Sequence, residues 1–596
     1  MTTPVRLDLN DAGDRITITA DYVDRERIRA MPGARWMPRD SVWQLPASLV
    51  AATLLQHDFA GRLQPSDSVK EHIASIAQVR SAALELARNP MAIDYTPSHT
   101  GDERLRPYQR LGIDWLLESG TGLLSDEMGS GKTVQIISAL DQLDGPFLVV
   151  APKSVLWTWQ REIAEWSTTL TPAVAIGSAA KRRKAFAAIE DGTANVLLIG
   201  YEALRSHSRL APYGSIRLKR CEACGGLPGE VTESRCEVHL KEANEIPWQA
   251  VIADEAHRMK DGKALQTRAV WWVGHQPSVE YRWALTGTPV ANHPADLWSI
   301  LHFLDPVEWP GRTTFIERWI EVAINPWGGH TLLGIKPERS DEFHALVDPY
   351  MLRRTKAMVL PDLPPKVRTV RTCELSPKEA KAYGEMRDDL IAELADGSDL
   401  MAVNPMVQVN RLLQMASSSM AADPISGSPI LAEPSSKLAL LEEVLGDIDL
   451  ESESVVVWFA HRQLLHLAED RLSKSGVSYV SFHGNCTDAE RSDAERRFQS
   501  GSVPVMLLTI GAGKEGLTLT RAATQIYVQR TWSLVDDLQS QDRLHRPGQT
   551  AERVLIIDLI TEGTVEEKLQ DVLAGKAADL ESVVRDRDAL MRLLND

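Results

Sequence analysis

The stretch from Leu123 to Thr133, LLSDEMGSGKT, constrains the chain most, because it has the order of a short apolar strand, a glycine-containing loop and a helix start. Gly129 and Gly131 let backbone N–H groups turn inward and approach a polyphosphate closely. We expect the Lys132 ammonium to contact the β- and γ-phosphates of a nucleotide and the Thr133 hydroxyl to ligate Mg²⁺. The helix that follows adds its N-terminal dipole to the same anion site.

One position departs from the usual phosphate loop. Asp126 stands where the pattern G-x-x-x-x-G-K-[ST] has its first glycine. Taken alone, the stretch also suits a plain glycine turn with a solvated lysine. A nucleotide site needs further residues that bind the metal ion and activate water. Whether such residues occur further along the chain decides between the two interpretations.

A second apolar stretch ends in two carboxylates. Val251–Ala253 reads as a strand and runs into Asp254 and Glu255. Asp254 can hold Mg²⁺ through water, while Glu255 orients or deprotonates the attacking water. A lone Asp-Glu pair at a strand end is more commonly two solvated acids, but here the phosphate loop supplies the nucleotide that both roles require. The sequence therefore predicts a site for ATP and Mg²⁺.

Three further residues are candidates near this site. Gln109 lies about one helix before the phosphate loop, and its amide can both donate to and accept from an adenine edge. Lys153 and Ser154 follow an apolar strand, residues 147–151. At the carboxyl end of a parallel strand they are candidate contacts for a nucleic-acid phosphate backbone.

A second run of alternating strands and helices begins near residue 437. Its expected strands cover residues 455–459, 505–508, 525–528 and 554–557, and it contains no phosphate loop of its own. Arg543 and Arg546 are three residues apart, so that on a helix they point the same way. They are either two surface arginines or arginine fingers that reach the nucleotide held by the first half.

Three of the five cysteines fall within sixteen residues, in a pattern typical of a zinc knuckle. Cys221 and Cys224 have two residues between them, as do Cys236 and His239. Two such pairs suit tetrahedral Zn²⁺, and four protein ligands favour a structural site over a catalytic one. We expect this knuckle to occupy residues 219–241.

Composition limits the class of protein. At 596 residues the chain is too long for one core. The N-terminus carries no signal sequence and no apolar run reaches membrane-spanning length, so we expect a cytoplasmic protein with no membrane partner, associated with the nucleoid when it binds DNA. The net charge of −17 opposes a generally basic surface, although a local groove can still be positive.

Residues 1–60 form a candidate N-terminal module. Arg15–Ala20 alternates as a strand should, and Trp36 and Trp43 flank the turn Pro38-Arg39-Asp40 of an expected hairpin. The two tryptophans either make a small core or belong to a nucleic-acid module that uses Arg35 and Arg39.

Taken in order, these blocks resemble the SNF2 family of superfamily 2 helicase-like ATPases. The matching segments are LRPYQ (105–109), DEMGSGKT (126–133), APKSVLWTWQREI (151–163), DEAH (254–257), LTGTP (285–289), FAHR (459–462), LLTIGAGKEGLTLT (507–520) and QDRLHRPGQ (541–549). The resemblance covers residues 100–565, and YMLRRTK (350–356) followed by LPPK (363–366) is its most family-specific part. The segments FAH (459–461) and FHG (482–484), with the N-terminal module, resemble the annealing-helicase branch and its HARP-type module most closely.

The resemblance implies an α/β fold with two RecA-like lobes, in which parallel sheets are flanked by helices. It further implies ATP hydrolysis between the lobes and translocation on double-stranded DNA, with Thr509 and Gly513 among the DNA contacts. The expected domains are an N-terminal HARP-like nucleic-acid module (1–60), a helical linker (61–100), lobe 1 with the knuckle (101–290), a helical SNF2-specific insertion (291–436), lobe 2 (437–565) and a C-terminal helix (566–596).

The sequence thus predicts a DNA-dependent ATPase and duplex translocase that remodels DNA junctions, forks or protein–DNA complexes. Its expected partners are double-stranded or branched DNA, ATP, and a replication, repair or transcription protein. One alternative is a transcription-linked SNF2 ATPase that acts on RNA polymerase. Another is a nucleotide-switched DNA-binding module without translocation, although a mere switch has no need of Asp254, Glu255 and both arginines.

Overall fold

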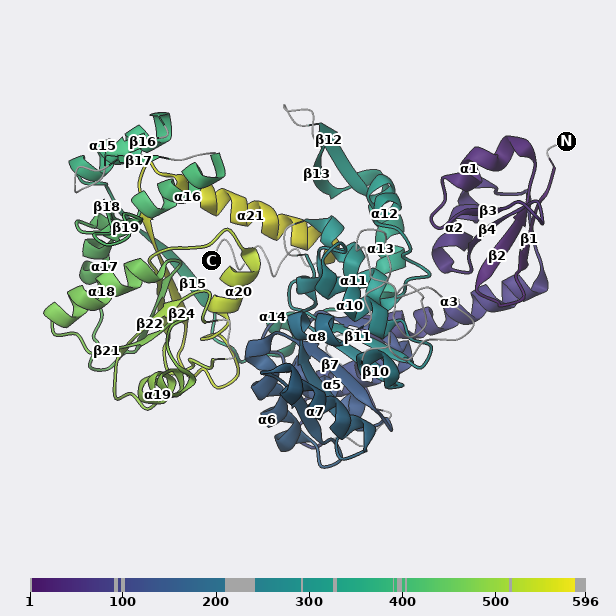
Figure 1. Cartoon of the computed structure of the whole chain (residues 1–596), viewed down its shortest axis with the longest axis horizontal. Coiled ribbons are helices and arrows are strands. Elements are labelled where there is room, and N and C mark those ends of the chain that lie inside the picture. The colour runs from purple at the N-terminus through teal and green to yellow at the C-terminus, as the bar shows by residue number, and fades with distance from the viewer. Residues whose placement is uncertain are drawn as a thin grey trace. The chain divides into compact units, whose positions relative to one another are not determined.

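The computed structural model divides the chain into two compact units, which are considered separately (Figure 1). The first comprises residues 1–359 with 582–584, and the second comprises residues 360–581 with 585–596. The structure describes residues 3–89, 95–97, 102–208, 242–290, 293–324, 330–389, 391–393, 399–401, 405–513 and 517–584. Within these ranges no helix has the length and apolar character needed to cross a membrane.

The N-terminal residues form a five-stranded sheet in the order β3-β4-β2-β1-β5. Its elements are β1 (Val5–Leu9), β2 (Arg15–Thr19), α1 (Arg25–Arg29), β3 (Arg35–Met37), β4 (Val42–Pro46), α2 (Leu49–Asp58) and β5 (Leu63–Pro65). The predicted hairpin is present, with Trp36 opposite Trp43 and their ring centroids 5.4 Å apart. Strand β5 pairs in parallel with β1, so the sheet extends beyond residue 60.

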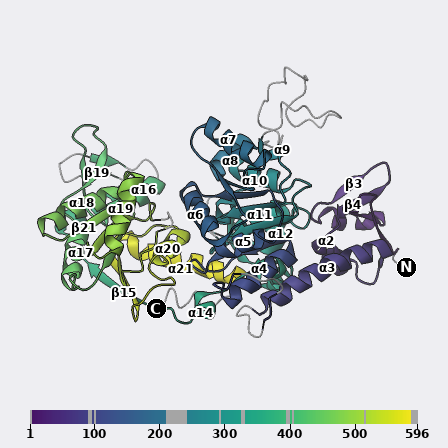
Figure 2. The ribbon, with the colours of Figure 1, turned by 90° about the horizontal axis from the view of Figure 1, so that it is seen from below.

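Helix α3 (Asp67–Ala87) contacts strand β1 of this sheet and helix α4 (Pro107–Ser119) of the first lobe. Figure 2 shows α3 running from the N-terminal strands toward α4. A second link comes from Glu308, whose carboxylate accepts the backbone N–H groups of Leu49 and Val50 at the start of α2. Because the first N–H groups of a helix have no partner within the helix, this carboxylate acts as a cap supplied from the lobe.

The first lobe is built on a seven-stranded sheet in which every strand pair is parallel, in the order β14-β6-β11-β10-β7-β9-β8. Its strands are β6 (Thr121–Leu124), β7 (Phe147–Ala151), β8 (Pro172–Ala175), β9 (Val196–Gly200), β10 (Ala250–Asp254), β11 (Tyr281–Leu285) and β14 (Met351–Leu352). The helices are α4, α5 (Lys132–Leu140), α6 (Leu156–Trp166), α7 (Ala179–Glu190), α8 (Tyr201–His207), α9 (Glu242–Glu245), α10 (Leu265–Gly274), α11 (Leu297–Leu304), α12 (Arg312–Trp319), α13 (Ser340–Val347) and α14 (Lys356–Val359). Strand β7 is apolar and buried throughout, as expected when helices cover both faces of a parallel sheet.

The second lobe has a six-stranded parallel sheet in the order β15-β24-β23-β20-β22-β21. Its strands are β15 (Lys366–Cys373), β20 (Val455–Phe459), β21 (Tyr479–Phe482), β22 (Val505–Thr509), β23 (Thr524–Tyr527) and β24 (Val554–Thr561). The helices are α15 (Pro377–Asp389), α16 (Pro405–Met415), α17 (Ser436–Gly446), α18 (Arg462–Lys474), α19 (Asp488–Gln499), α20 (Leu534–Gln541) and α21 (Val565–Val584). The two parallel sheets with flanking helices confirm the predicted α/β fold with RecA-like lobes.

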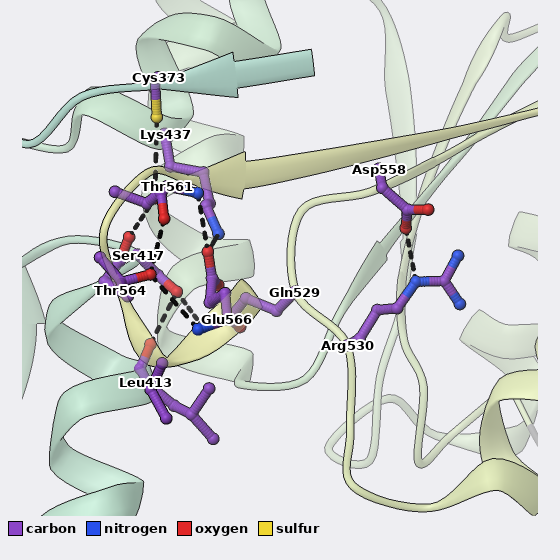
Figure 3. Close-up of polar contacts among 12 residues, drawn as sticks. Cys373, Leu413, Ser417, Lys437, Gln529, Arg530, Asp558, Thr561, Thr564 and Glu566 are labelled. Atoms are coloured by element: carbon purple, nitrogen blue, oxygen red, sulfur yellow. Dashed lines mark hydrogen bonds and ion pairs between the residues drawn. The ribbon is translucent and has the colours of Figure 1, made fainter. Parts of the chain in front are cut away.

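A buried polar network ties the last strand of this lobe to its helices (Figure 3). Lys437 of α17 pairs with Glu566 of α21, and the Glu566 carboxylate also accepts the backbone N–H of Thr561 at 3.0 Å. Nearby, Asp558 of β24 accepts hydrogen bonds from Arg530 and Arg368. Burial opposes ionisation of Asp558, but these two guanidinium groups outweigh it and lower its pKa.

The segment expected to be a helical insertion, residues 291–436, differs from the prediction. It contributes β14 to the first sheet and β15 to the second, and it also contains the antiparallel pairs β12 (Ile320–Ile324) with β13 (His330–Ile335), β16 (Ile391–Glu393) with β17 (Asp399–Met401), and β18 (Ser419–Ala422) with β19 (Pro429–Ala432). Strand β15 lies at the sheet edge, and most of its side chains are partly or fully exposed. Its basic residues between valines and threonines therefore lack the apolar run by which buried strands are found.

Candidate active site

The phosphate loop runs from the end of β6 to the start of α5. Gly129 and Gly131 have φ values of 80° and 79°, in the left-handed region that side chains rarely adopt. A Cβ atom at Gly131 would lie 2.4 Å from the Gln109 Nε2 atom. Both glycines are thus required by the loop geometry, as the sequence predicted.

Lys132 begins helix α5, and its Nζ donates hydrogen bonds to the backbone oxygens of Asp126 at 2.7 Å and Glu127 at 3.1 Å. Burial lowers the pKa of Lys132, and the charges of Glu255, Asp126 and Asp254 oppose that shift. The fold therefore gathers the predicted phosphate-binding lysine and the two predicted catalytic carboxylates at one edge of the sheet.

Asp254 ends strand β10 and is fixed by two neighbours. The Trp159 indole Nε1 donates to Asp254 Oδ2 at 2.8 Å, and the Tyr201 hydroxyl donates to the Asp254 backbone oxygen at 2.7 Å. Burial, together with the charge of Glu255, raises the pKa of Asp254 to about 6. Trp159 of α6 is itself buried, so it packs in the interior of the lobe while its indole N–H orients the predicted catalytic carboxylate of Asp254.

Glu255 follows with φ of 51°, a backbone conformation that is costly for a residue other than glycine. Its Oε2 atom lies 3.3 Å from His257 Nδ1, which in turn lies 3.1 Å from the Thr286 hydroxyl. That hydroxyl accepts the backbone N–H of Thr288 at 3.1 Å. His257 thus connects Glu255 with the turn after β11, the segment LTGTP (285–289) of the resemblance.

Asp126, the departure from the phosphate-loop pattern, pairs with Arg354 in the interior, and neither side chain has exposed surface. Arg354 Nε donates to one carboxylate oxygen at 2.9 Å and Nη2 to the other at 2.5 Å, while Nη2 also donates to Gln135 Oε1. The remaining nitrogen donates to the Tyr108 backbone oxygen. Gly112 of α4 borders this network, and a Cβ there would lie 1.9 Å from Gln135 Oε1.

The backbone on either side of Arg354 also pairs with the phosphate loop. Leu352 accepts the Ser125 N–H at 2.7 Å, and Arg354 accepts the Glu127 N–H at 3.0 Å, so that the segment extends the pairing of β14 with β6. The Arg353 guanidinium donates to the backbone oxygens of Ser125 at 2.9 Å and Gly287 at 3.1 Å. The segment 351–356 therefore lies alongside the phosphate loop and is hydrogen-bonded to it.

Sequence reasoning placed Arg353 and Arg354 in a family-specific segment and gave them no role at the site. The negative charge of Asp126 could have indicated their role. An aspartate inside a phosphate loop adds a negative charge next to a polyphosphate, so it requires a cation nearby. The adjacent arginines of YMLRRTK were candidates for that cation.

The donor set around Lys132 suits the expected cofactor. The Thr133 hydroxyl and the Asp254 carboxylate are hard oxygen ligands of the kind that Mg²⁺ prefers. The Gln109 amide donates to the Ser130 backbone oxygen at 3.2 Å and accepts the Arg106 N–H at 2.9 Å. Gln109 therefore contacts the phosphate loop, and its contact with adenine stays a prediction.

The first-lobe candidates for DNA contacts lie at the surface. Lys153 and Ser154 are exposed in the short turn that follows β7. Lys153 lines a surface hollow of about 350 Å³ together with Arg182 of α7. Glu202 also lines this hollow, so its charged lining is two cations and one carboxylate, and the phosphate contact of Lys153 and Ser154 stays a prediction.

The second lobe carries the other candidates. Arg543 and Arg546 lie after the end of α20, in a turn, so the helical spacing expected for them is wrong. Arg543 donates to the Leu517 backbone oxygen at 3.4 Å, and Arg546 donates to the Thr518 hydroxyl at 2.9 Å. Because both contact the same neighbouring loop, they still lie near each other.

Thr509 and Gly513 also belong to the second lobe, where both are buried. Gly513 donates its N–H to the Thr509 backbone oxygen at 3.0 Å, and a Cβ at Gly513 would lie 2.4 Å from the Trp458 ring. The close packing against Trp458 therefore requires glycine at position 513. The DNA contacts of Thr509 and Gly513 stay predictions. The proposed zinc ligands Cys221, Cys224, Cys236 and His239 lie outside the described residues.

Comparisons with known proteins agree with this geometry. A family model described as the SNF2-related domain matches residues 108–420, and one described as the helicase conserved C-terminal domain matches residues 436–548.

Among similar curated proteins, the nuclear protein STH1/NPS1 of Saccharomyces cerevisiae is 28% identical over 543 residues, which are 84% of this chain and 37% of that protein. The ISWI chromatin-remodeling complex ATPase CHR11 of Arabidopsis thaliana is 30% identical over 485 residues, 78% of this chain and 41% of that protein. The chain thus spans less than half the length of these relatives.

Among solved structures, the Sulfolobus solfataricus SWI2/SNF2 ATPase core in complex with dsDNA is similar at 24% identity. The match covers 84% of this chain and 97% of that chain, with a TM-score of 0.37.

Proposed function

Since the chain belongs to the family of proteins with an SNF2-related domain and carries its ATPase core, we propose that it is a DNA-dependent ATPase that moves along double-stranded DNA. The observation that carries the proposal is the meeting of Lys132, Asp254 and Glu255 at the carboxyl edge of the first sheet. Ligands of open parallel sheets bind at that edge.

In this proposal each residue has a stated task. Lys132 neutralises the β- and γ-phosphates, while Thr133 and Asp254 hold Mg²⁺, which offsets phosphate charge during transfer. Glu255 orients or deprotonates the attacking water, and its contact with His257 limits the positions that the carboxylate can take. Arg543 and Arg546 of the second lobe act on the γ-phosphate as arginine fingers.

The substrate proposed is duplex DNA within junctions, forks or protein–DNA complexes. The name of the CHR11 relative, a chromatin-remodeling complex ATPase, supports protein-bound duplex DNA as one such substrate. The comparisons do not support the annealing-helicase branch or a cytoplasmic location, since the relatives include a protein named as nuclear. Association with DNA is the location that the proposed function requires.

The test is ATP turnover measured without DNA and with single-stranded, duplex and forked DNA. Duplex should stimulate turnover, Lys132→Ala should abolish it, Glu255→Gln should trap bound ATP, and Arg543→Ala or Arg546→Ala should slow turnover about 10³-fold or more. Displacement of a third strand from triplex DNA, driven by ATP, measures movement along the duplex. Turnover that ignores DNA, or persists in Lys132→Ala, would overturn the proposal.

A further inference from the structure

A group of three metal-ligating side chains lies in the second lobe, away from every residue given a role above. His466 and Glu469 are three residues apart on α18, and His483 follows strand β21. One ligand atom from each of the three lies within 4.8 Å of the others. In the part of the chain that the structure describes, no other set of three His, Cys or carboxylate groups meets that criterion.

The contacts within this group hold its side chains in place. His466 Nδ1 lies 2.6 Å from Glu469 Oε2, while the second oxygen of Glu469 accepts the Ser481 hydroxyl. The rings of His466 and His483 meet edge to face, with centroids 5.1 Å apart. Asn485 donates its backbone N–H to His483 Nδ1 at 3.3 Å.

From this arrangement we infer that His466, Glu469 and His483 form a binding site for a divalent transition-metal ion of the Zn²⁺ class. Two imidazoles and one carboxylate are the ligand types that Zn²⁺ takes in three-ligand sites, with a fourth position left for solvent. Zn–N bonds of about 2.0–2.1 Å place the ligand atoms of a tetrahedral site ~3.3 Å apart. Side-chain rotations that move each ligand atom by about an ångström therefore bring the three atoms to that spacing. His466 is 47% exposed and has room for that rotation.

Ser481 is the positioning residue of the site. Ligating carboxylates are ordinarily held by a further hydrogen bond, and the Ser481 hydroxyl supplies one to Glu469. The nearby cation Arg491 is directed to backbone, since its guanidinium donates to the oxygens of His483 and Gly484.

A metal here would join helix α18 to the turn after β21, at the carboxyl edge of the second sheet. Strands β20, β21 and β22 run parallel and therefore end at that same edge. The three ligands belong to the second unit, whereas Cys221, Cys224, Cys236 and His239 fall in the range of the first unit, so the two proposed metal sites are distinct.

The test is Zn²⁺ binding by the untagged full-length protein, measured as equivalents per chain by equilibrium dialysis. His466→Ala and His483→Ala should each bind one equivalent less than wild type, and Ser481→Ala should bind that equivalent about 10–100-fold more weakly. Because none of these variants changes Cys221, Cys224, Cys236 or His239, zinc bound by those residues cancels in the difference. His57→Ala is the matched control, since His57 is also exposed and pairs with Asp58, but within the described residues it belongs to no set of three metal-ligating side chains.

A second measurement guards against misfolding of the variants. Zn²⁺ should raise the melting temperature of wild type more than that of His466→Ala, because a bound ion stabilises the folded state. Equal zinc stoichiometry in wild type, His466→Ala and His483→Ala would overturn the inference, as would an equal zinc-induced shift in their melting temperatures.

Discussion

Arg354 and Asp126 are 228 residues apart in sequence and form an ion pair in which neither side chain is exposed. The aspartate belongs to the phosphate loop, and the arginine belongs to the segment that extends β14 alongside it. Both oxygens of Asp126 are occupied by Arg354, and Gln135 Nε2 donates a further bond at 3.2 Å. The loop conformation therefore depends on a residue that lies far outside its own motif.

Removing Arg354 should destabilise the first lobe strongly. Arg354→Ala leaves the Asp126 carboxylate buried without its cation, a change that costs about 3–5 kcal/mol. We expect a large fall in the urea midpoint of the first-lobe transition, with loss of ATP binding. Arg104→Ala is the control, because Arg104 makes a similar carboxylate pair with Asp102 at the surface and should leave the midpoint close to wild type.

The pair can also be tested as a unit. If Arg354 acts through Asp126, the double variant Asp126→Asn with Arg354→Gln should be less destabilised than the sum of the two single variants. Additive effects would show that Arg354 stabilises the lobe mainly through Tyr108 and Gln135.

Trp159 should affect catalysis without touching ATP. Trp159→Phe keeps most of the buried ring but removes the N–H that donates to Asp254 Oδ2. Because such supporting bonds hold metal-ligating carboxylates, we expect the apparent Mg²⁺ affinity in the ATPase assay to fall about 10–100-fold. Trp166→Phe, on the same helix, is the matched control. Equal Mg²⁺ dependence of the two variants would rule out this role for Trp159.

Glu308 should make docking of the N-terminal sheet depend on pH. Burial, with the nearby charge of Asp305, raises the pKa of Glu308 to about 7, despite the N–H groups of Leu49 and Val50 that favour its ionised form. A carboxyl whose pKa is raised by docking binds its proton more tightly in the docked state. Docking is therefore strongest below the ordinary pKa of 4.5 and weakens as pH rises through about 7.

Hydrogen exchange at the start of α2 measures this effect. Protection factors of the Leu49 and Val50 amides, corrected for intrinsic exchange, should be higher at pH 5.5 than at pH 8 in wild type. In Glu308→Gln they should change little across that range, because the amide does not titrate. A wild type whose protection rises with pH would contradict the assignment.

The apolar strands were predictable from sequence, since β7 and β20 are buried on both faces and read as unbroken apolar runs. The same holds for the loop glycines and the carboxylates at the end of β10, where residue type alone indicates the chemistry. Strand β15 was missed because it is an exposed edge strand with basic residues between its valines.

The role of Arg354 was missed for a different reason. Its partner follows the neighbouring strand β6, and sequence spacing carries no information about a contact 228 residues away. The turn that holds Arg543 and Arg546 was read as a helix, since two arginines three residues apart fit a helical face equally well. Helix α20 ends at Gln541, before either of them.

The last prediction concerns Arg35, Trp36 and Arg39, which are exposed together on the β3–β4 hairpin. Trp36 is 47% exposed, so part of the ring is available to an unpaired base even though it contacts Trp43. Since the net charge of −17 gives no general attraction to DNA, discrimination among DNA structures has to come from such local contacts.

Arg35→Ala with Arg39→Ala should leave ATPase activity on plain duplex largely intact and reduce its stimulation by forked or gapped DNA. Deletion of the module should give a larger loss of the same kind, and it should remove residues 1–66, because a cut at residue 60 would leave β5 without its partner β1. Arg27→Ala with Arg29→Ala, on exposed positions of α1, is the control of equal charge. Equal stimulation by fork and duplex in wild type and in both double variants would show that the hairpin does not read DNA structure.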